Sequence, residues 1–312
     1  MKNIKDKIKK ILPDKLFYFY LVLKKTPKYI VALKHNKKIN YPVIDFYDDV
    51  KTVDLIVNDH KSLVRFGDGE FLWMSGEKLE SYQDYSEEFS NDLRNAFQSN
   101  NKNLLVGIPY GIINSKKCNL NAKLHWEIIK SDSFERILEF VDLNKTYCNA
   151  SITRPYIDYR DYKFSTDNFN NLKRIWNKRD VVFVEGEKTK LGMGNDLFDN
   201  ANSVKRIICP ATNAYEKKEL IKNSILKNVS KDTLILGALG PTASILAVEM
   251  TELGYQFVDI GHVDIEYMWY LNHSILRDEI PGKYVNESGS KTCSNIYDND
   301  ENYLNSIIDR IV

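Results

Sequence analysis

The chain has 312 residues, of which 43% are hydrophobic and 28% are charged, an ordinary composition for a globular protein. Its formal net charge of +1 does not indicate a nucleic-acid-binding protein. The four cysteines form no C-x-x-C pair, which argues against a zinc knuckle. The sequence also shows no secretory signal and no long apolar run, so we expect the protein in the reducing cytoplasm.

Residues 1–41 form a basic and aromatic extension. Residues 1–40 contain twelve lysines and two acidic residues, whereas the remainder contains 32 basic and 41 acidic residues. We expect Pro13 and Pro27 to divide the extension into short helical pieces. Ile4, Ile8 and Ile11 recur at helical spacing, which predicts one apolar stripe. Lysines surround this stripe, together with Leu12 and Phe17: Lys2, Lys5, Lys7, Lys9, Lys10 and Lys15.

This pattern favours docking of the extension on an anionic membrane surface. The alternative is that it packs on the rest of the chain or binds a partner enzyme. From residue 42 onward, strand-like and helix-like segments alternate, which predicts one Rossmann-like α/β domain over residues 42–312 with a mainly parallel sheet flanked by helices. The expected strands are 62–66, 103–108, 180–184, 204–209, 233–236 and 256–260, and the expected helices are 214–227, 241–253 and 303–311.

Two acids follow the first predicted strand in the segment Arg65-Phe66-Gly67-Asp68-Gly69-Glu70. If the strand continues through it, Asp68 and Glu70 point to the same side, because side chains alternate along a strand. Paired carboxylates between glycines suit a hard divalent cation, and Arg65 could then contact a phosphate. The alternative is a solvated turn, in which Asp-Gly is common.

A second polar segment directly follows the last strand of the predicted βαβ unit. An extended backbone would place His262, Asp264 and Glu266 on one side, where ligands of open α/β sheets bind. His262 could be a metal ligand or a general base, or a hydrogen-bonded structural histidine. The sequence leaves open which of the three residues has which role.

Two glycine-containing loops also follow predicted strands. In the segment 237–243, Gly240 and Thr242 lie at a helix N-terminus that is open to an anion. The loop 185–196 is expected to contact the same ligand, with Lys188 or Lys190 neutralising a diphosphate. Its candidate contacts are Lys188, Thr189, Lys190, Gly192, Gly194 and Asn195. The alternatives are a tight strand-to-helix turn and a plain surface loop.

Together these segments resemble the GT-D-type glycosyltransferases, a bacterial family, over about residues 54–270. The most specific matches are 64–71, 184–200, 208–215, 236–243 and 258–269. The resemblance implies a Rossmann-like sheet and a UDP-sugar donor, with UDP-glucose the known case. It also implies an Asp-x-Glu metal motif, which Asp68-Gly69-Glu70 matches, and a role in surface-polysaccharide or glycoprotein synthesis.

The resemblance implies that Mn²⁺ or Mg²⁺ at Asp68 and Glu70 bridges the donor diphosphate, with His262 as a third contact or a base. Asp264 and Glu266 are then the candidates for activating a hydroxyl of a glycan or lipid-linked acceptor. Arg65, Gly67 and the two glycine-containing loops would contact the donor. Two alternatives remain: a non-catalytic nucleotide-sugar-binding or scaffolding protein, and another Rossmann-type enzyme such as a methyltransferase.

Overall fold

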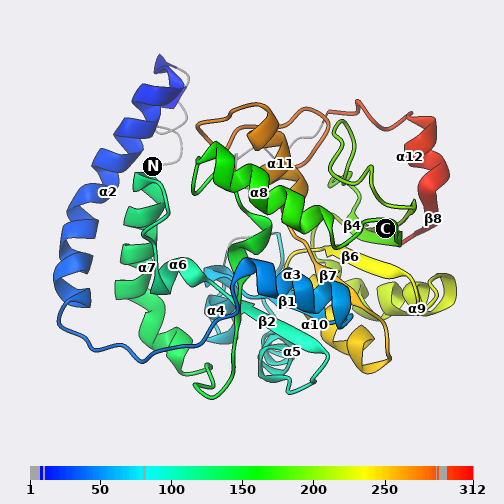
Figure 1. Cartoon of the computed structure of the whole chain (residues 1–312), viewed down its shortest axis with the longest axis horizontal. Coiled ribbons are helices and arrows are strands. Elements are labelled where there is room, and N and C mark those ends of the chain that lie inside the picture. The colour runs from blue at the N-terminus through cyan, green and yellow to red at the C-terminus, as the bar shows by residue number, and fades with distance from the viewer. Residues whose placement is uncertain (1–7, 10, 80–81, 286, 288–293, 312) are drawn as a thin grey trace.

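The computed structural model describes residues 8–9, 11–79, 82–285, 287 and 294–311. Their strands form one eight-stranded sheet with the order β3-β2-β1-β7-β6-β4-β5-β8, and every pair of neighbours is parallel (Figure 1). This arrangement confirms the predicted α/β class. The strands are β1 (Ser62–Arg65), β2 (Leu104–Ile108), β3 (Cys148–Asn149), β4 (Asp180–Gly186), β5 (Ser203–Cys209), β6 (Leu234–Ala238), β7 (Phe257–Asp259) and β8 (Ile307–Arg310).

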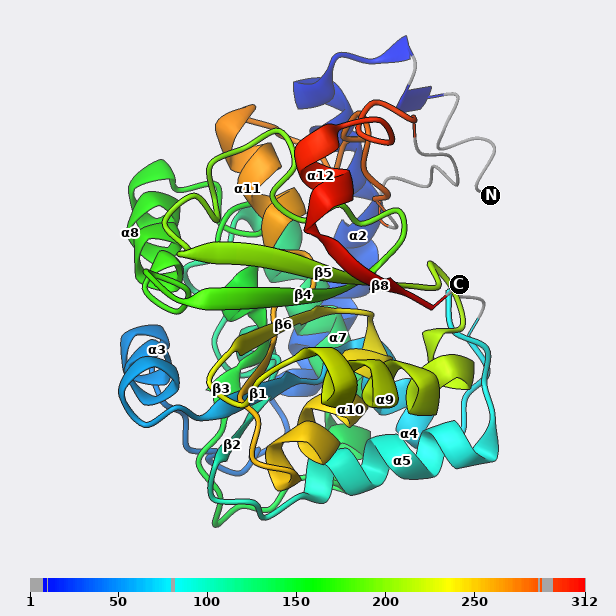
Figure 2. The same cartoon turned by 90° about the vertical axis from the view of Figure 1, so that its right-hand side faces the viewer.

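Helices cover both faces of this sheet (Figure 2). One face packs against α4 (Asp68–Met74), α5 (Glu87–Gln98), α7 (Leu120–Leu138), α9 (Lys218–Asn228) and α10 (Pro241–Glu252). The other face packs against α3 (Asp49–Asn58), α8 (Tyr162–Lys173) and α11 (Val263–Leu271). The short elements are α6 (Tyr110–Ile113), η1 (Ala150–Thr153), η2 (Ala214–Lys217) and α12 (Glu301–Ser306).

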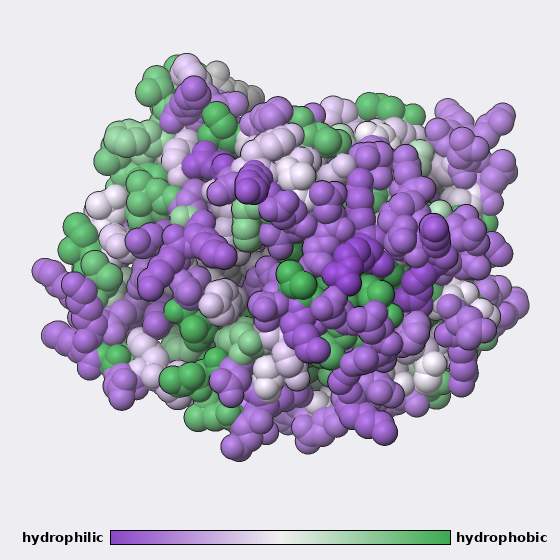
Figure 3. Space-filling view, viewed as in Figure 1, coloured by the Kyte–Doolittle hydropathy of each residue, from purple (hydrophilic) through white to green (hydrophobic). Residues whose placement is uncertain are grey.

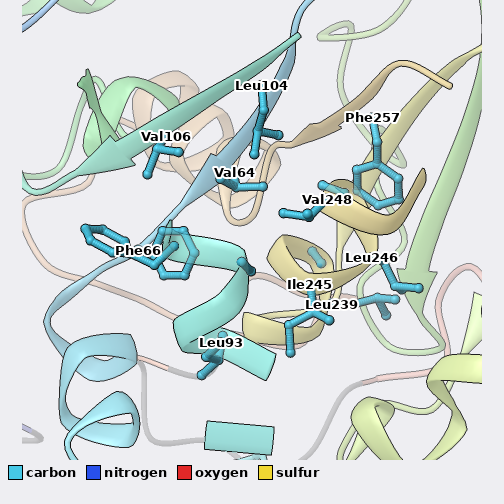
Figure 4. Packing of buried hydrophobic residues seen from close by; sticks show 14 of the residues in the cluster. Val64, Phe66, Leu93, Leu104, Val106, Leu239, Ile245, Leu246, Val248 and Phe257 are labelled. Carbon is cyan, nitrogen blue, oxygen red and sulfur yellow. The ribbon is translucent and has the colours of Figure 1, made fainter. Parts of the chain in front are cut away.

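The central strands are apolar because both of their faces are covered. All five residues of β2 and of β6 are buried. Figure 4 shows Val64 of β1 and Val106 of β2 in the core that also holds Ile245 and Val248 of α10. This core fixes the central strands, and it therefore fixes the loops that leave their carboxyl ends.

The N-terminal helix differs from its prediction. A single helix, α2 (Asp14–Asn36), runs through Pro27, so the expected break at this proline is wrong. Pro13 precedes the helix, as a proline can. Phe17, Val22 and Ala32 are buried on the face that packs along α7, and this packing outweighs the one hydrogen bond that Pro27 cannot make.

The C-terminal prediction is also wrong in part. The segment 303–311 was expected to be one helix, but α12 ends at Ser306 and Ile307–Arg310 form β8. This strand pairs with β5, which would otherwise be an edge of the sheet with unpaired backbone groups. The free edge therefore decides the conformation of a short apolar segment whose periodicity also fits a helix.

The sheet has a narrow seam between β1 and β7, where one pair of residues, Leu63 and Val258, is in register. β2 and β3 lie on one side of the seam, and β6, β4, β5 and β8 lie on the other. Across the described part of the chain, no helix has both the length and the apolar character of a membrane span.

Candidate active site

A cavity of about 460 Å³ opens at the carboxyl ends of the central strands. This is the position at which open α/β sheets bind ligands. The charged and imidazole side chains that line it are Arg65, Asp68, Glu70, His125, Arg154, Asp158, Asp259, His262, Asp264, Arg277 and Glu287. Among these described residues, six carboxylates face three guanidinium groups, so the cavity is acidic.

Asp68 and Glu70 both line this cavity, but not through the expected backbone. β1 ends at Arg65 and α4 begins at Asp68, so the prediction that a strand carries both carboxylates to one side is wrong. Gly67 caps the helix, and its N–H donates to Glu70 Oε2 at 2.8 Å. Acidic side chains in a first helical turn are stabilised by the helix dipole, which explains why two of them are tolerated here.

Glu70 is poorly placed to carry a charge on its own. Burial, together with the negative charges of Asp68 and Asp259, raises the pKa of its carboxyl group to about 7, although the Gly67 hydrogen bond lowers it. A cation beside the two carboxylates would favour the ionised form. Oxygen ligands on a helix N-terminus at an open cavity fit a hard divalent cation such as Mn²⁺ or Mg²⁺.

No three His, Cys, Asp or Glu side chains of the described residues lie close enough together to hold a metal. A ligand set of Asp68, Glu70 and His262 is therefore not preformed, and the role of His262 at a cation stays a prediction. A cation held by two carboxylates would take its other ligands from water and substrate oxygens. His262 itself lines the cavity, and burial lowers the pKa of its imidazole to about 4. The ring is thus neutral near neutral pH, and its burial makes it a weak base.

Arg65 is held in the floor of the cavity rather than extended toward a ligand. Its Nε and Nη2 groups donate to the carbonyl oxygen and Oδ1 of Asp259, at 2.9 and 2.8 Å. Its Nη1 group donates to Ala150 O and Thr153 Oγ1. Most of its donors are already used, so the predicted bidentate contact with a phosphate is not preformed. A Cβ atom on Gly261, whose φ is +44°, would lie 2.0 Å from Arg65 Nη2, so only glycine fits there.

The second motif also lies on a helix. α11 begins at Val263, so the extended alternation predicted for His262, Asp264 and Glu266 is wrong. Asp264 borders the cavity, but it accepts hydrogen bonds from Gly192 N at 3.0 Å and Asn195 Nδ2 at 2.7 Å and forms a buried ion pair with Lys283. These three donors make Asp264 an anchor for a loop rather than a free base.

Glu266 lies outside the lining of the cavity and is fully buried. It accepts hydrogen bonds from Tyr156 N at 3.2 Å and Ile157 N at 2.9 Å, and Arg154 Nε lies 3.4 Å away. Burial raises the pKa of its carboxyl group to about 7, while the charge of Arg154 opposes this shift. The predicted role of Glu266 as a base at the substrate is therefore not supported, since no acceptor in this cavity reaches it.

The loop 185–196 contributes less to the cavity than predicted. Of its six candidate contacts, Thr189 lines the cavity and the others do not. Lys188 is exposed, and Lys190 is buried in an ion pair with Asp298, so neither is placed to neutralise a diphosphate there. Gly192 and Asn195 bind Asp264, and Gly194 packs against the Tyr297 ring. The glycines thus shape the loop around Asp264.

The N-terminus of α10 is partly as predicted. Gly240 lines the cavity with a φ of +56°, and a Cβ atom there would lie 2.4 Å from the Tyr82 ring. Thr242 is fully buried behind it, and its Oγ1 has no hydrogen-bond partner among the described residues. Gly240 can therefore meet a ligand, whereas Thr242 lies one layer deeper.

Several residues of the cavity carried no recognisable sequence signal. Arg154 and Arg277 both pair with Glu287, the latter at 3.2 Å, and Arg277 also pairs with Asp158 at 2.9 Å. Burial alone would raise the pKa of Glu287, but the two guanidinium groups hold it below its usual range. His125 of α7 adds a second imidazole, whose pKa burial lowers and the Asp68 charge raises. All of these residues are brought together only by the fold.

A protein-family model described as the glycosyltransferase GT-D fold matches residues 63–288. Glycosyltransferase GlyD of Streptococcus pneumoniae serotype 4 is 35% identical over 266 residues, 84% of this chain, and the probable glycosyl transferase Gly of Streptococcus gordonii is 36% identical over 223 residues, 70% of this chain. Each match covers 32% of the relative, so the chain spans about a third of the length of these curated proteins.

Solved structures show the same fold. A structure described as the highly conserved domain of unknown function 1792 with a distinct glycosyltransferase fold has a TM-score of 0.79 and 35% identity, over 86% of this chain and 96% of that one. A structure described as a new glycosyltransferase of this domain family from Streptococcus sanguinis has a TM-score of 0.80 and 32% identity, over 86% of this chain and 100% of that one.

Proposed function

We propose that this chain, which belongs to the family of glycosyltransferases with the GT-D fold, transfers a hexose such as glucose from a UDP-sugar to a glycan or glycoconjugate acceptor. The proposed setting is the synthesis of a bacterial surface polysaccharide or glycoprotein. The observation that carries the proposal is the acidic cavity at the carboxyl ends of the central strands, with Asp68 and Glu70 at its edge.

The charge of this cavity argues for a cation. A nucleotide diphosphate is itself anionic. With Asp264 neutralised by Lys283, five carboxylates still face three guanidinium groups, so the lining would repel the diphosphate more strongly than it attracts it. We propose that Asp68 and Glu70 hold Mn²⁺ or Mg²⁺. When bound, the cation would neutralise the negative charge that develops on the leaving nucleotide.

The side chains of the cavity supply the remaining contacts. Trp73 lines it, and its Nε1 group is buried with no hydrogen-bond partner among the described residues, so it can donate to the donor substrate. We propose that His262, which lines the cavity, accepts the proton of the acceptor hydroxyl as the new bond to C1 forms and the bond from C1 to the phosphate oxygen breaks. Asp264 and Glu266 support the surrounding loops.

Donor turnover tests this proposal. We expect the full chain to release UDP from UDP-glucose with Mn²⁺ and not in chelator. A donor at about 100 times its dissociation constant should stabilise the fold by roughly 2.7 kcal/mol. A scaffolding protein would show the stabilisation without UDP release, and a methyltransferase would show neither. If every UDP-sugar in a set gives stabilisation without UDP release, or gives neither effect, the proposal is contradicted.

We also propose that the outward face of α2 binds an anionic membrane. The outward face carries an apolar stripe whose residues follow one another at spacings of three, four and seven: Leu16, Phe19, Leu23 and Ile30. Between 48% and 57% of each of these residues is exposed. They lie opposite the face that packs on α7, and Figure 3 shows hydrophobic residues along the edge of the molecule that α2 forms. Exposed lysines lie on either side of this apolar stripe: Lys15, Lys24 and Lys28.

Of the stripe expected at Ile4, Ile8 and Ile11, Ile4 lies outside the described residues, whereas Ile8 is half-buried and Ile11 is 78% exposed. The surface proposed here lies further along the extension, on α2. The structure leaves room for both alternatives given for the extension, packing on the rest of the chain and docking on a membrane, because α2 packs on α7 with one face and leaves the opposite face exposed. A lipid-linked acceptor would give this contact a function. Each basic residue near anionic lipid contributes about 1 kcal/mol, and the apolar stripe adds burial in the interface.

Flotation tests the membrane surface. We expect the full chain to float at low salt with vesicles of phosphatidylcholine and phosphatidylglycerol but not with phosphatidylcholine alone. The triple variant Leu16→Ser, Phe19→Ser, Leu23→Ser should remain at the bottom. A matched control, Val43→Ser, Val50→Ser, Leu220→Ser, removes equally exposed apolar residues elsewhere and should float like the original chain. Equal flotation of both triple variants would exclude this surface.

A further inference from the structure

A second, open cavity of about 500 Å³ lies beside the first. It is formed where the beginnings of α7 and α8 meet the segment that follows α11 (Figure 1). Its lining is dominated by aromatic rings and neutral polar groups: Asn119, Tyr156, Tyr159, Arg160, Tyr162, His273, Ser274 and Ile275. The residues proposed to bind the donor and the cation are not part of this lining.

The two cavities share a wall. The segment 156–160 lines the second cavity with Tyr159 and Arg160 and the first with Asp158. The segment 273–277 lines the second cavity with His273, Ser274 and Ile275 and the first cavity with Arg277. The Asp158–Arg277 ion pair, at 2.9 Å, joins the two segments at this wall. A chain-like ligand that entered the first cavity would therefore reach the second by crossing one ion pair.

The aromatic side chains are arranged as a stack. The Tyr162 ring lies 4.4 Å from the Tyr270 ring and 4.8 Å from the His273 ring, with interplanar angles of 22° and 11°. Tyr162 remains 42% exposed at the rim. Tyr162 is thus stacked between the other two rings, and the stack ends at the exposed ring of His273. An exposed ring beside tyrosine hydroxyl groups offers an apolar face and hydrogen bonds together, which suits the C–H faces and hydroxyl groups of sugar rings.

Arg160 has an unused donor at this cavity. Its guanidinium group lies over the Tyr18 ring of α2, with 3.9 Å from Cζ to the ring centroid. It forms no ion pair with the described residues, and its Nε group is buried without a hydrogen-bond partner among them. Both Arg160 and His273 have positive φ, at +55° and +51°, although neither is glycine. Such strain and unsatisfied donors concentrate at ligand sites.

We propose that this second cavity binds neutral sugar units of the acceptor, next to the unit that receives the transferred hexose. The exposed His273 ring at the end of the stack would pack on a sugar face, and Arg160 would donate to a sugar oxygen. One guanidinium group without lysines favours a neutral glycan over a diphosphate. This inference rests on the proposed glycosyltransferase function, because it concerns the acceptor of that reaction.

The test separates the acceptor from the donor. The full chain is given UDP-glucose with Mn²⁺ and a panel of neutral acceptors, the p-nitrophenyl β-glycosides of glucose, galactose, N-acetylglucosamine and their disaccharides. His273→Ala and Arg160→Met should each raise the KM of the best disaccharide acceptor about tenfold, the loss of roughly one ring contact or one hydrogen bond. UDP release without acceptor should stay within about twofold of the original, since the donor contacts are unchanged.

Tyr110→Ala is the matched control, because Tyr110 is half-buried against Phe46 and lies in neither lining. It should leave both measurements unchanged. The inference is overturned if the two variants keep the original acceptor KM, or if no neutral glycoside accepts a sugar while UDP release proceeds. Loss of UDP release in the original chain would instead be a failure of the proposed function.

Discussion

Asp68→Asn is expected to lower donor turnover by about 10²- to 10³-fold, the effect of removing one group that stabilises charge in a transition state. Asp68 lies at the edge of the cavity, and its side chain makes no hydrogen bond or ion pair with the other described residues. The substitution therefore removes the proposed ligand for the cation without removing an internal contact. The melting temperature should remain that of the original chain while UDP release from UDP-glucose with Mn²⁺ falls.

Glu70→Gln is the companion variant. The remaining amide oxygen can still accept the Gly67 N–H, so the cap of α4 is kept while the charge is lost. Asp167→Asn, on the exposed side of α8, changes one carboxylate outside the cavity and should retain full turnover. If Asp68→Asn and Glu70→Gln in chelator both keep the full activity that the original chain has with Mn²⁺, the two residues hold no catalytic cation.

Lys283→Met is expected to reduce the free energy of unfolding by about 3–5 kcal/mol, the usual cost of leaving a buried charge without its partner. The Lys283 and Asp264 side chains are 0% and 1% exposed. Without the ammonium group, Asp264 keeps only the neutral donors Gly192 N and Asn195 Nδ2. Urea unfolding of the full chain, followed by circular dichroism, measures the change.

Arg174→Met is the control for this variant, because the Arg174–Asp54 pair is 44% and 35% exposed and should contribute less than about 1 kcal/mol. The double variant Lys283→Met, Asp264→Leu should recover part of the lost stability, since no charge is then buried unpaired. A similar small loss for Lys283→Met and Arg174→Met would show that the buried pair is not what holds the loop 185–196 to α11.

The sheet could be predicted from the sequence because its strands are buried on both faces. Six apolar runs between glycines and prolines correspond to β1, β2, β4, β5, β6 and β7 within two residues at each end. The exceptions depend on tertiary contacts. The segment of β8 is a strand only because β5 offers an unpaired edge, and α2 continues through Pro27 because α7 supports it.

The candidate site was predicted in position but not in geometry. The motifs at Asp68 and His262 do reach one cavity, as residues after neighbouring strands should. Their side chains were assigned to extended backbone, whereas each motif begins a helix. The partners of these residues are remote in sequence: Asp259 lies 194 positions from Arg65, and Glu287 lies 133 positions from Arg154. No pattern within a short segment of sequence predicts contacts between residues so far apart.

The seam between β1 and β7 has a consequence for how the protein acquires activity. Asp68 follows β1, His262 follows β7, and the Arg65–Asp259 ion pair joins the two strand ends across 194 positions. Contacts between residues so far apart close large loops, and they slow folding. The lining of the candidate cavity comes from both halves of the sheet. During synthesis the chain would thus remain inactive until its last third has joined β1. Activity would therefore be measurable only after the whole sheet has formed.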